Sequence, residues 1–195
     1  MRYAETKRKT TETDIKLSIE LDGSGIYSVS TGCGFFDHML ELFARHGRFD
    51  LNVVCKGDIK VDCHHSVEDT GIALGNAFRQ AVGKGRGITR YGSVILPMDE
   101  ALVLCAADLS GRGHCSCLLE IPSPRIGAFD SELAEEFFTA FCRSASVTMH
   151  LRQLDGRNSH HIVEAAFKAA ARALRQAVAI DPAFADEIPS TKGVL

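Results

Sequence analysis

One segment of this sequence occurs twice, and this repeat constrains the fold more than any other feature. The pattern His-His-x-x-Glu begins at residue 64 and returns at residue 160, which is 96 positions later. Twenty residues compared from each start contain ten identities, whereas chance would give about one. The repeat predicts an internally duplicated chain, with a first half at residues 1–95 and a second half at residues 96–195 that share one core.

The apolar residues predict that both copies of the repeat are long helices, near 64–82 and 160–179. Five positions at helical spacing form a stripe in each copy, and the two stripes are 96 residues apart: Val67, Gly71, Leu74, Phe78 and Ala81, then Val163, Phe167, Ala170, Leu174 and Ala177. Alternation and turn residues predict strands near 15–19, 26–30, 49–53, 101–109, 114–121 and 147–154, and further helices near 37–45 and 131–146. We therefore expect an α+β fold in which each half is a β-sheet with helices packed on one face.

The overall composition excludes several classes of protein. The net charge is −3 and there is no long basic run, so nucleic acid is not an expected partner. No apolar stretch approaches the roughly 18 residues that span a membrane, and the N-terminus lacks the apolar core of a signal peptide. The seven cysteines include no zinc-type pair, so we expect free, mostly buried thiols in a reducing cytoplasm.

The repeated motif carries the chemical groups of a metal site. His64 and Glu68 are one helical turn apart and lie near one face, whereas the adjacent His65 diverges by about 100°. Each histidine pair is therefore suited to two different metal ions, and each ion could receive one histidine from each half together with one glutamate. Imidazole and carboxylate ligands favour Mn, Fe, Co or Zn. A polar helix start is the alternative for a single motif, but it does not account for the repetition.

Weaker signals lie elsewhere in the chain. Arg90, Arg112, Lys168 and the segment Ser190-Thr191-Lys192 offer cations beside hydroxyl groups or small residues, which a phosphate monoester requires; each residue alone also fits a solvated surface. His114 and His150 lie on expected strands, where structural roles come first, although His150 could orient a metal ligand. Residues 186–195 have no periodicity, so this tail is either frayed or held by a ligand or a neighbour.

Seven motifs along nearly the whole chain resemble the imidazoleglycerol-phosphate dehydratase family. They are residues 34–40 (GFFDHML), 45–47 (RHG), 62–71 (DCHHSVEDTG), 97–101 (PMDEA), 108–112 (DLSGR), 158–165 (NSHHIVEA) and 189–195 (PSTKGVL). No extra domain is visible, so the chain resembles the monofunctional form, without a fused histidinol-phosphatase. The resemblance implies loss of water from imidazoleglycerol phosphate to give imidazole-acetol phosphate in histidine biosynthesis.

The resemblance also implies two Mn(II) ions per active site and an assembly of 24 chains. The implied metal ligands are His38, His64, His65, Glu68, Glu136, His160, His161 and Glu164. Glu136 departs from the family pattern, because many members have a histidine in this place. The implied substrate contacts are Glu12, His38, His46, Arg90, Arg112, Lys168, Ser190, Thr191 and Lys192.

The implied reaction needs both a metal and a proton carrier. The proton lost with water lies on a carbon without an adjacent carbonyl, so metals on both imidazole nitrogens would stabilise an imidazolate. The ring could then expel the hydroxyl through a diazafulvene-like intermediate, with Glu164 and Glu12 as the candidates that move protons. Two alternatives stay open. One is a dinuclear metallohydrolase acting on a phosphorylated small molecule; the other is a non-catalytic metal-binding cage protein, which would not need Arg90, Arg112 or Lys192.

Overall fold

The computed structural model describes residues 1–195 and contains two four-stranded sheets of the same design. The first sheet has the strand order β1-β2-β4-β3, and the second has the order β5-β6-β10-β7. In both sheets the first three strands in this order are antiparallel, and the last strand is parallel to its neighbour. The strands are β1 (Tyr3–Lys9), β2 (Thr13–Glu20), β3 (Tyr27–Ser30), β4 (Asp50–Gly57), β5 (Tyr91–Met98), β6 (Ala101–Asp108), β7 (His114–Leu118), β8 (Arg125–Ile126), β9 (Phe129–Asp130) and β10 (Thr148–Asp155). The helices are α1 (Gly34–Gly47), α2 (His64–Val82), α3 (Leu133–Ala145), α4 (Ser159–Val178) and the short 3-10 helix η1 (Pro182–Phe184).

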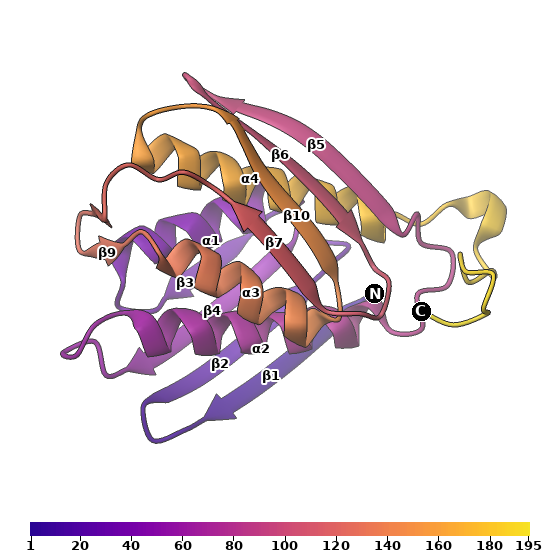
Figure 1. Cartoon of the computed structure of the whole chain (residues 1–195). Coiled ribbons are helices and arrows are strands. Elements are labelled where there is room, and N and C mark those ends of the chain that lie inside the picture. Colours follow the sequence, from indigo (N-terminus) through magenta and orange to yellow (C-terminus); the bar gives the residue numbers. More distant parts are fainter.

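The four α-helices lie between the two sheets (Figure 1). Helix α2 packs on β1 and β2, and helix α4 packs on β5 and β6. The helices of one half then meet those of the other, because α2 packs against α3 and α1 against α4. One cluster of buried apolar residues therefore runs through both halves, and the predicted α+β fold is confirmed. None of these helices combines the length and the apolar character needed to cross a membrane.

The predicted helices and strands are confirmed, with shifts at their ends. The helix predicted at 64–82 is α2 and the helix predicted at 160–179 is α4, and all ten stripe residues are buried. Helix α1 begins at residue 34 rather than 37, and Asp37 accepts the backbone N–H of Thr31 at 2.8 Å, which holds the chain where it enters the helix. The strands β1 and β5 and the hairpin β8–β9 were not predicted.

The boundary between the halves is better placed in a loop than in a strand. The predicted boundary at residues 95–96 falls inside β5. The first sheet uses residues 3–57, and the second uses residues 91–155. We propose that the halves divide in the segment 83–90, between α2 and β5.

Helices α2 and α3 approach each other closely because Gly75 has no side chain. A Cβ atom at Gly75 would lie 2.6 Å from the carbonyl oxygen of Phe141 and 2.7 Å from Cβ of Ser144. One turn further along α2, the rings of Phe78 and Phe141 pack edge to face, with their centroids 5.5 Å apart. The close packing of α3 on α2 brings the first turn of α3, with Glu136, to the start of α2.

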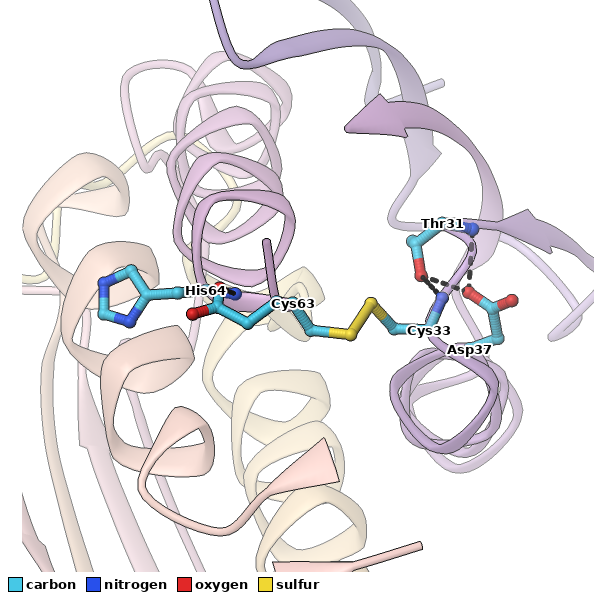
Figure 2. Close-up of a disulfide and its surroundings, with 6 residues drawn as sticks. Thr31, Cys33, Asp37, Cys63 and His64 are labelled. Atoms are coloured by element: carbon cyan, nitrogen blue, oxygen red, sulfur yellow. Dashed lines mark hydrogen bonds between the residues drawn. A yellow bond between two sulfur atoms is a disulfide. The ribbon is translucent and has the colours of Figure 1, made fainter. Parts of the chain in front are cut away.

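Two of the seven cysteines form a disulfide, Cys33–Cys63. The expectation of free thiols is wrong for this pair, whereas the other five cysteines are free and buried or half-buried. Cys33 precedes α1 and Cys63 precedes α2, so the bond joins the starts of two helices (Figure 2). A separation of 30 residues contains no signal for this pairing, because only the fold brings the two Cα atoms to 6.3 Å.

Candidate metal centre

Three predicted ligands meet where α1 and α4 pack together, and they form the first cluster. One nitrogen of His38, one nitrogen of His160 and one oxygen of Glu164 lie within 4.8 Å of one another. The Nε2 atoms of His160 and His38 are 3.1 Å and 3.7 Å from Oε2 of Glu164. Asn158 caps α4 by accepting the backbone N–H groups of His160 and His161, which fixes the turn that carries the ligands. The cluster offers two imidazoles and one carboxylate to a single cation.

Three further predicted ligands form the second cluster, where α2 and α3 pack together. Ligand atoms of His64, Glu68 and Glu136 lie within 4.8 Å of one another. The Nε2 atom of His64 is 3.9 Å from Oε2 of Glu68, one turn along α2. Glu136 reaches this place from the first turn of α3. The second cluster offers one imidazole and two carboxylates, a set richer in oxygen than the first.

The two clusters follow the internal repeat. In each one, the long helix of one half supplies a histidine and a glutamate, and the shorter helix of the other half supplies His38 or Glu136. Both clusters therefore combine residues of the two halves, as the sequence predicts, but the second has a carboxylate where one histidine from each half was expected. Six of the eight predicted ligands lie in the clusters, and His65 and His161 lie outside them.

The carboxylate of Glu164 is held in its ionised form by the groups packed against it. Burial raises the pKa of Glu164, but the salt bridge from Lys168 and the hydrogen bond with His160 outweigh it and leave the pKa below its ordinary value. His46 lies near the same residues, and burial, followed by the charges of Lys168 and Arg172, lowers its pKa. The predicted substrate contacts Lys168 and His46 therefore lie beside the first cluster.

His65 and His161, which we call the outward histidines, point away from the clusters because adjacent helical residues diverge. Nδ1 of His65 is 3.0 Å from Oδ2 of Asp58, and Nδ1 of His161 is 2.6 Å from Oε2 of Glu100. Each of these hydrogen bonds raises the pKa of its imidazole. The negative charge of Glu12 also raises the pKa of His65. Glu12, a predicted substrate contact, therefore lies near an outward histidine and not in a cluster.

Five of the six predicted phosphate contacts gather at the far end of α4, which we call the basic end, whereas the sixth, Lys168, lies beside the first cluster. The members of the basic end are Arg90, Arg112, Ser190, Thr191 and Lys192. The backbone N–H of Arg90 donates to the carbonyl of Ala177, which follows His160 by 17 residues on α4 and therefore lies about 25 Å along the helix. Arg112 joins this end because Gly111 packs against the terminal Leu195. Figure 1 shows the tail at the opposite end of α4 from its start. The basic end therefore cannot reach the first cluster of its own chain.

The C-terminal tail is held in place, which is one of the two outcomes expected from the sequence. Arg90 Nη1 donates to the carbonyl of Pro189 at 2.8 Å while its Nε donates to Asp108, also at 2.8 Å. Arg86 Nη1 donates to the carbonyl of Asp186 at 2.7 Å. Leu195 packs against the apolar core. Neighbouring segments of the same chain therefore hold the tail.

Sequence reasoning missed the carboxylates that face the outward histidines. Asp58 precedes His65 by seven residues and lies in the loop after β4, and Glu100 precedes His161 by 61 residues in the turn between β5 and β6. No helical or strand spacing links these pairs, so only the fold reveals them. His150 was considered as a residue that orients a ligand, but its ring faces His114 instead, with the centroids 5.8 Å apart.

Comparison with known proteins shows the family and the fold of this chain. A family model described as imidazoleglycerol-phosphate dehydratase matches residues 31–174. Relatives of that name from Jannaschia sp. (strain CCS1) and Roseobacter denitrificans are 58% and 57% identical over 195 residues, which cover 100% of each chain. The crystal structure of the imidazoleglycerol-phosphate dehydratase of Staphylococcus aureus superposes with a TM-score of 0.84 at 36% identity, over 92% of this chain and 99% of that one. A crystal structure of the imidazoleglycerol-phosphate dehydratase of Pyrococcus furiosus also superposes with a TM-score of 0.84. Its sequence identity is 37%, and the match covers 97% of this chain and 100% of that one.

Proposed function

The chain belongs to the imidazoleglycerol-phosphate dehydratase family of hydro-lyases, and on this premise we propose that it converts imidazoleglycerol phosphate to imidazole-acetol phosphate by loss of water. The reaction belongs to histidine biosynthesis, and we propose that it takes place in the cytoplasm. The observation that carries the proposal is the pair of three-residue clusters, which assemble imidazole and carboxylate groups from both halves of the chain.

We propose that each cluster holds one Mn(II) ion. The ligand atoms are imidazole nitrogens and carboxylate oxygens, which suit Mn(II), and neither cluster contains a cysteine. When bound, the two ions would supply Lewis-acid stabilisation of negative charge on the imidazole ring of the substrate. Each cluster supplies three protein ligands, which leaves coordination positions for a further ligand and for the substrate.

The residues of this chain would move the protons and hold the phosphate. The proton to be removed lies on a carbon without an adjacent carbonyl, so a positioned base is needed, and Glu164 is kept ionised by Lys168. The ring would first expel the hydroxyl to give a diazafulvene-like intermediate, with Glu12 giving a proton to the leaving oxygen. Glu164 would then take the proton from the adjacent carbon, and the enol that forms would become the ketone of the product. Arg90 and Arg112 would bind the phosphate through charge-assisted hydrogen bonds.

A complete active site would need more than one copy of the chain. The basic end lies about 25 Å from the first cluster of its own chain, farther than a small sugar phosphate can span. The outward histidines have imidazoles suited to metal binding but belong to neither cluster. We propose that they complete the clusters of neighbouring copies, that the basic end of another copy binds the phosphate, and that 24 copies close into one assembly.

The test is incubation of the protein with imidazoleglycerol phosphate. We expect imidazole-acetol phosphate to form, the activity to disappear after chelation, and Mn(II) to restore it. Release of inorganic phosphate would instead identify a dinuclear metallohydrolase. A metal-loaded protein that leaves the substrate unchanged would overturn the proposal and favour the cage protein. In a cage protein the only property to measure is metal binding, and substitution of Arg90 or Arg112 would leave it unchanged.

A further inference from the structure

Each outward histidine is hydrogen-bonded through Nδ1 to a carboxylate from a distant part of the fold. Both oxygens of Asp58 face Nδ1 of His65, at 3.0 Å and 3.2 Å. Only one oxygen of Glu100 faces Nδ1 of His161, at 2.6 Å. In both pairs the carboxylate leaves the Nε2 atom of the ring free of this interaction.

The two cluster histidines that belong to the repeated motif, His64 and His160, are held differently. The Nε2 atoms of His64 and His160 face the glutamate one turn along their own helix, so the spacing within the motif orients them. The outward histidines lie on the same helix starts but take their partners from loops. The structure therefore separates two kinds of imidazole, one oriented within its helix and one oriented from outside.

The two carboxylates come from different loops of the two halves. Asp58 follows β4, whereas Glu100 directly precedes β6. The residue in the equivalent place before β2 is Glu12, which lies near enough to His65 for its charge to act on that ring but is not its hydrogen-bond partner. Each half therefore brings a carboxylate to Nδ1 of its outward histidine, and the same hydrogen bond forms from two different loops.

Glu100 is itself held in position by the backbone. Its second oxygen accepts the N–H of Asn158 at 2.8 Å and the N–H of Arg157 at 3.4 Å, in the loop that leads into α4. The carboxylate can therefore not rotate freely, and its free oxygen is fixed on Nδ1 of His161. On the other side of that ring, Asp99 makes a looser contact with Nε2 at 3.7 Å, and its side chain is 71% exposed.

We propose that Asp58 and Glu100 are positioning residues that keep the hydrogen of each outward imidazole on Nδ1, so that Nε2 is free to bind the metal ion of a neighbouring copy. This inference rests on the proposed function. A metal-binding histidine that donates its other N–H to a carboxylate has a fixed tautomer and a fixed ring orientation, and its nitrogen becomes more basic. The loose contact of Asp99 with Nε2 would be replaced by the metal.

The different geometries of the two pairs lead to a sharp test by amide substitution. In Glu100→Gln, the amide oxygen keeps the two backbone N–H groups, so the amide NH₂ faces Nδ1 of His161. Nδ1 must then accept a hydrogen bond from the amide, so the ring hydrogen moves to Nε2. Because Nε2 is the atom proposed to bind the metal, this shift blocks metal binding. In Asp58→Asn, the amide can turn its oxygen toward His65, because both carboxylate oxygens of Asp58 face the ring. The same loss of charge therefore has different consequences at the two sites.

The measurement is the Mn(II) affinity of the intact protein, followed by the electron paramagnetic resonance signal of free Mn(II). We expect Glu100→Gln and Asp58→Ala each to weaken the binding of one ion per chain by about 10- to 100-fold, and Asp58→Asn to weaken it by less than about tenfold. Asp62→Asn is the matched control, since Asp62 lies in the same loop as Asp58 and accepts only the backbone N–H of His64. The control should bind both ions like the wild type.

The outcomes separate this inference from the proposed function. If the wild type binds no Mn(II), the proposed function fails and the positioning role fails with it. If the wild type binds two ions per chain and both Glu100→Gln and Asp58→Ala bind them with unchanged affinity, only the positioning role is overturned. Equal losses in Glu100→Gln and Asp58→Asn would also overturn it, because charge alone would then explain the effect. Thermal unfolding of the metal-free variants identifies any that fail to fold.

Discussion

At the scale of single residues, Glu136 is the candidate ligand that most distinguishes the two clusters. It reaches the second cluster from the first turn of α3, and His38 reaches the first cluster from α1. The two clusters therefore offer different ligands, since the first has two imidazoles and the second has one. Carboxylate and imidazole both suit Mn(II), so a glutamate in this place is compatible with the proposed metal.

Substitution of Glu136 tests whether it binds metal. Glu136→Gln removes the anionic ligand but keeps the size of the side chain, so we expect the metal content to fall from two ions to about one per chain. Glu136→His replaces the carboxylate with an imidazole, which also suits Mn(II), and should keep both ions. Elemental analysis after gel filtration gives the ratio. Unchanged metal content in Glu136→Gln would mean that this residue is not a ligand and that water or substrate completes the second cluster.

The pairing of candidate ligands within each helix could be predicted from the sequence, but the partners of the outward histidines could not. His64 with Glu68, and His160 with Glu164, follow from the helical repeat, and the divergence of the adjacent histidines also follows from it. By contrast, Glu100 meets His161 only because the turn between β5 and β6 lies beside the start of α4. Such a contact depends on tertiary structure and has no spacing rule.

At the scale of secondary structure, the predicted elements are those with a full apolar stripe or alternation. Strands β2 and β6 have alternate residues buried, and both could be predicted. The two missed strands β1 and β5 are the first strands of their sheets, and each buries only one residue completely. An edge strand with one half-covered face has little hydrophobic alternation, so the sequence contains no signal strong enough to find it.

The disulfide Cys33–Cys63 also concerns secondary structure, because it joins the starts of helices α1 and α2 (Figure 2). Cys63 immediately precedes His64 of the second cluster, and α1 carries His38 of the first cluster. In Figure 2 the side chain of His64 points away from the disulfide. The bond therefore closes a loop that contains α1 and β4, and the side chain of His64 lies outside it.

Loss of this bond should lower stability more than it alters the fold. Closing a loop of 30 residues restricts the unfolded chain, so Cys33→Ser with Cys63→Ser should lower the free energy of unfolding by about 3 to 4 kcal/mol. Denaturant unfolding measures the change, and a phosphine reductant should have a similar effect on the wild type and none on the variant. Alkylation of the unreduced, unfolded wild type should label five of the seven cysteines. Labelling of all seven would show that the bond does not form.

At the scale of the whole molecule, the proposed sharing of ligands makes metal binding part of the assembly. If outward histidines complete the clusters of neighbouring copies, the free energy of metal binding also stabilises the contacts between chains. Chelation should then convert the assembly into smaller species, and Mn(II) should restore the original size. Light scattering before chelation, after it and after addition of Mn(II) follows both steps. A stripped protein that keeps its full size would show that protein contacts alone hold the copies together.

Mixed assemblies test whether the active site is shared between copies. One variant, His160→Ala, loses the first cluster but keeps the basic end, and the other, Arg112→Ala, keeps the cluster but loses a predicted phosphate contact. The Arg112 side chain donates only to the carbonyl of its neighbour Ser110, so its removal should leave the fold intact. The first cluster and the basic end lie about 25 Å apart in one chain, so each active site would take them from different copies.

Each variant alone should be nearly inactive, because every site in its assembly lacks the same group. When the two stripped proteins are mixed in equal amounts and reassembled with Mn(II), roughly a quarter of the sites should combine an intact cluster with an intact basic end. The mixture should therefore recover about a quarter of the wild-type activity, whereas the variants mixed after separate assembly should recover none. If reassembly produces no activity although light scattering shows mixed particles of full size, both groups must act within one chain, and the proposed sharing of the active site is wrong.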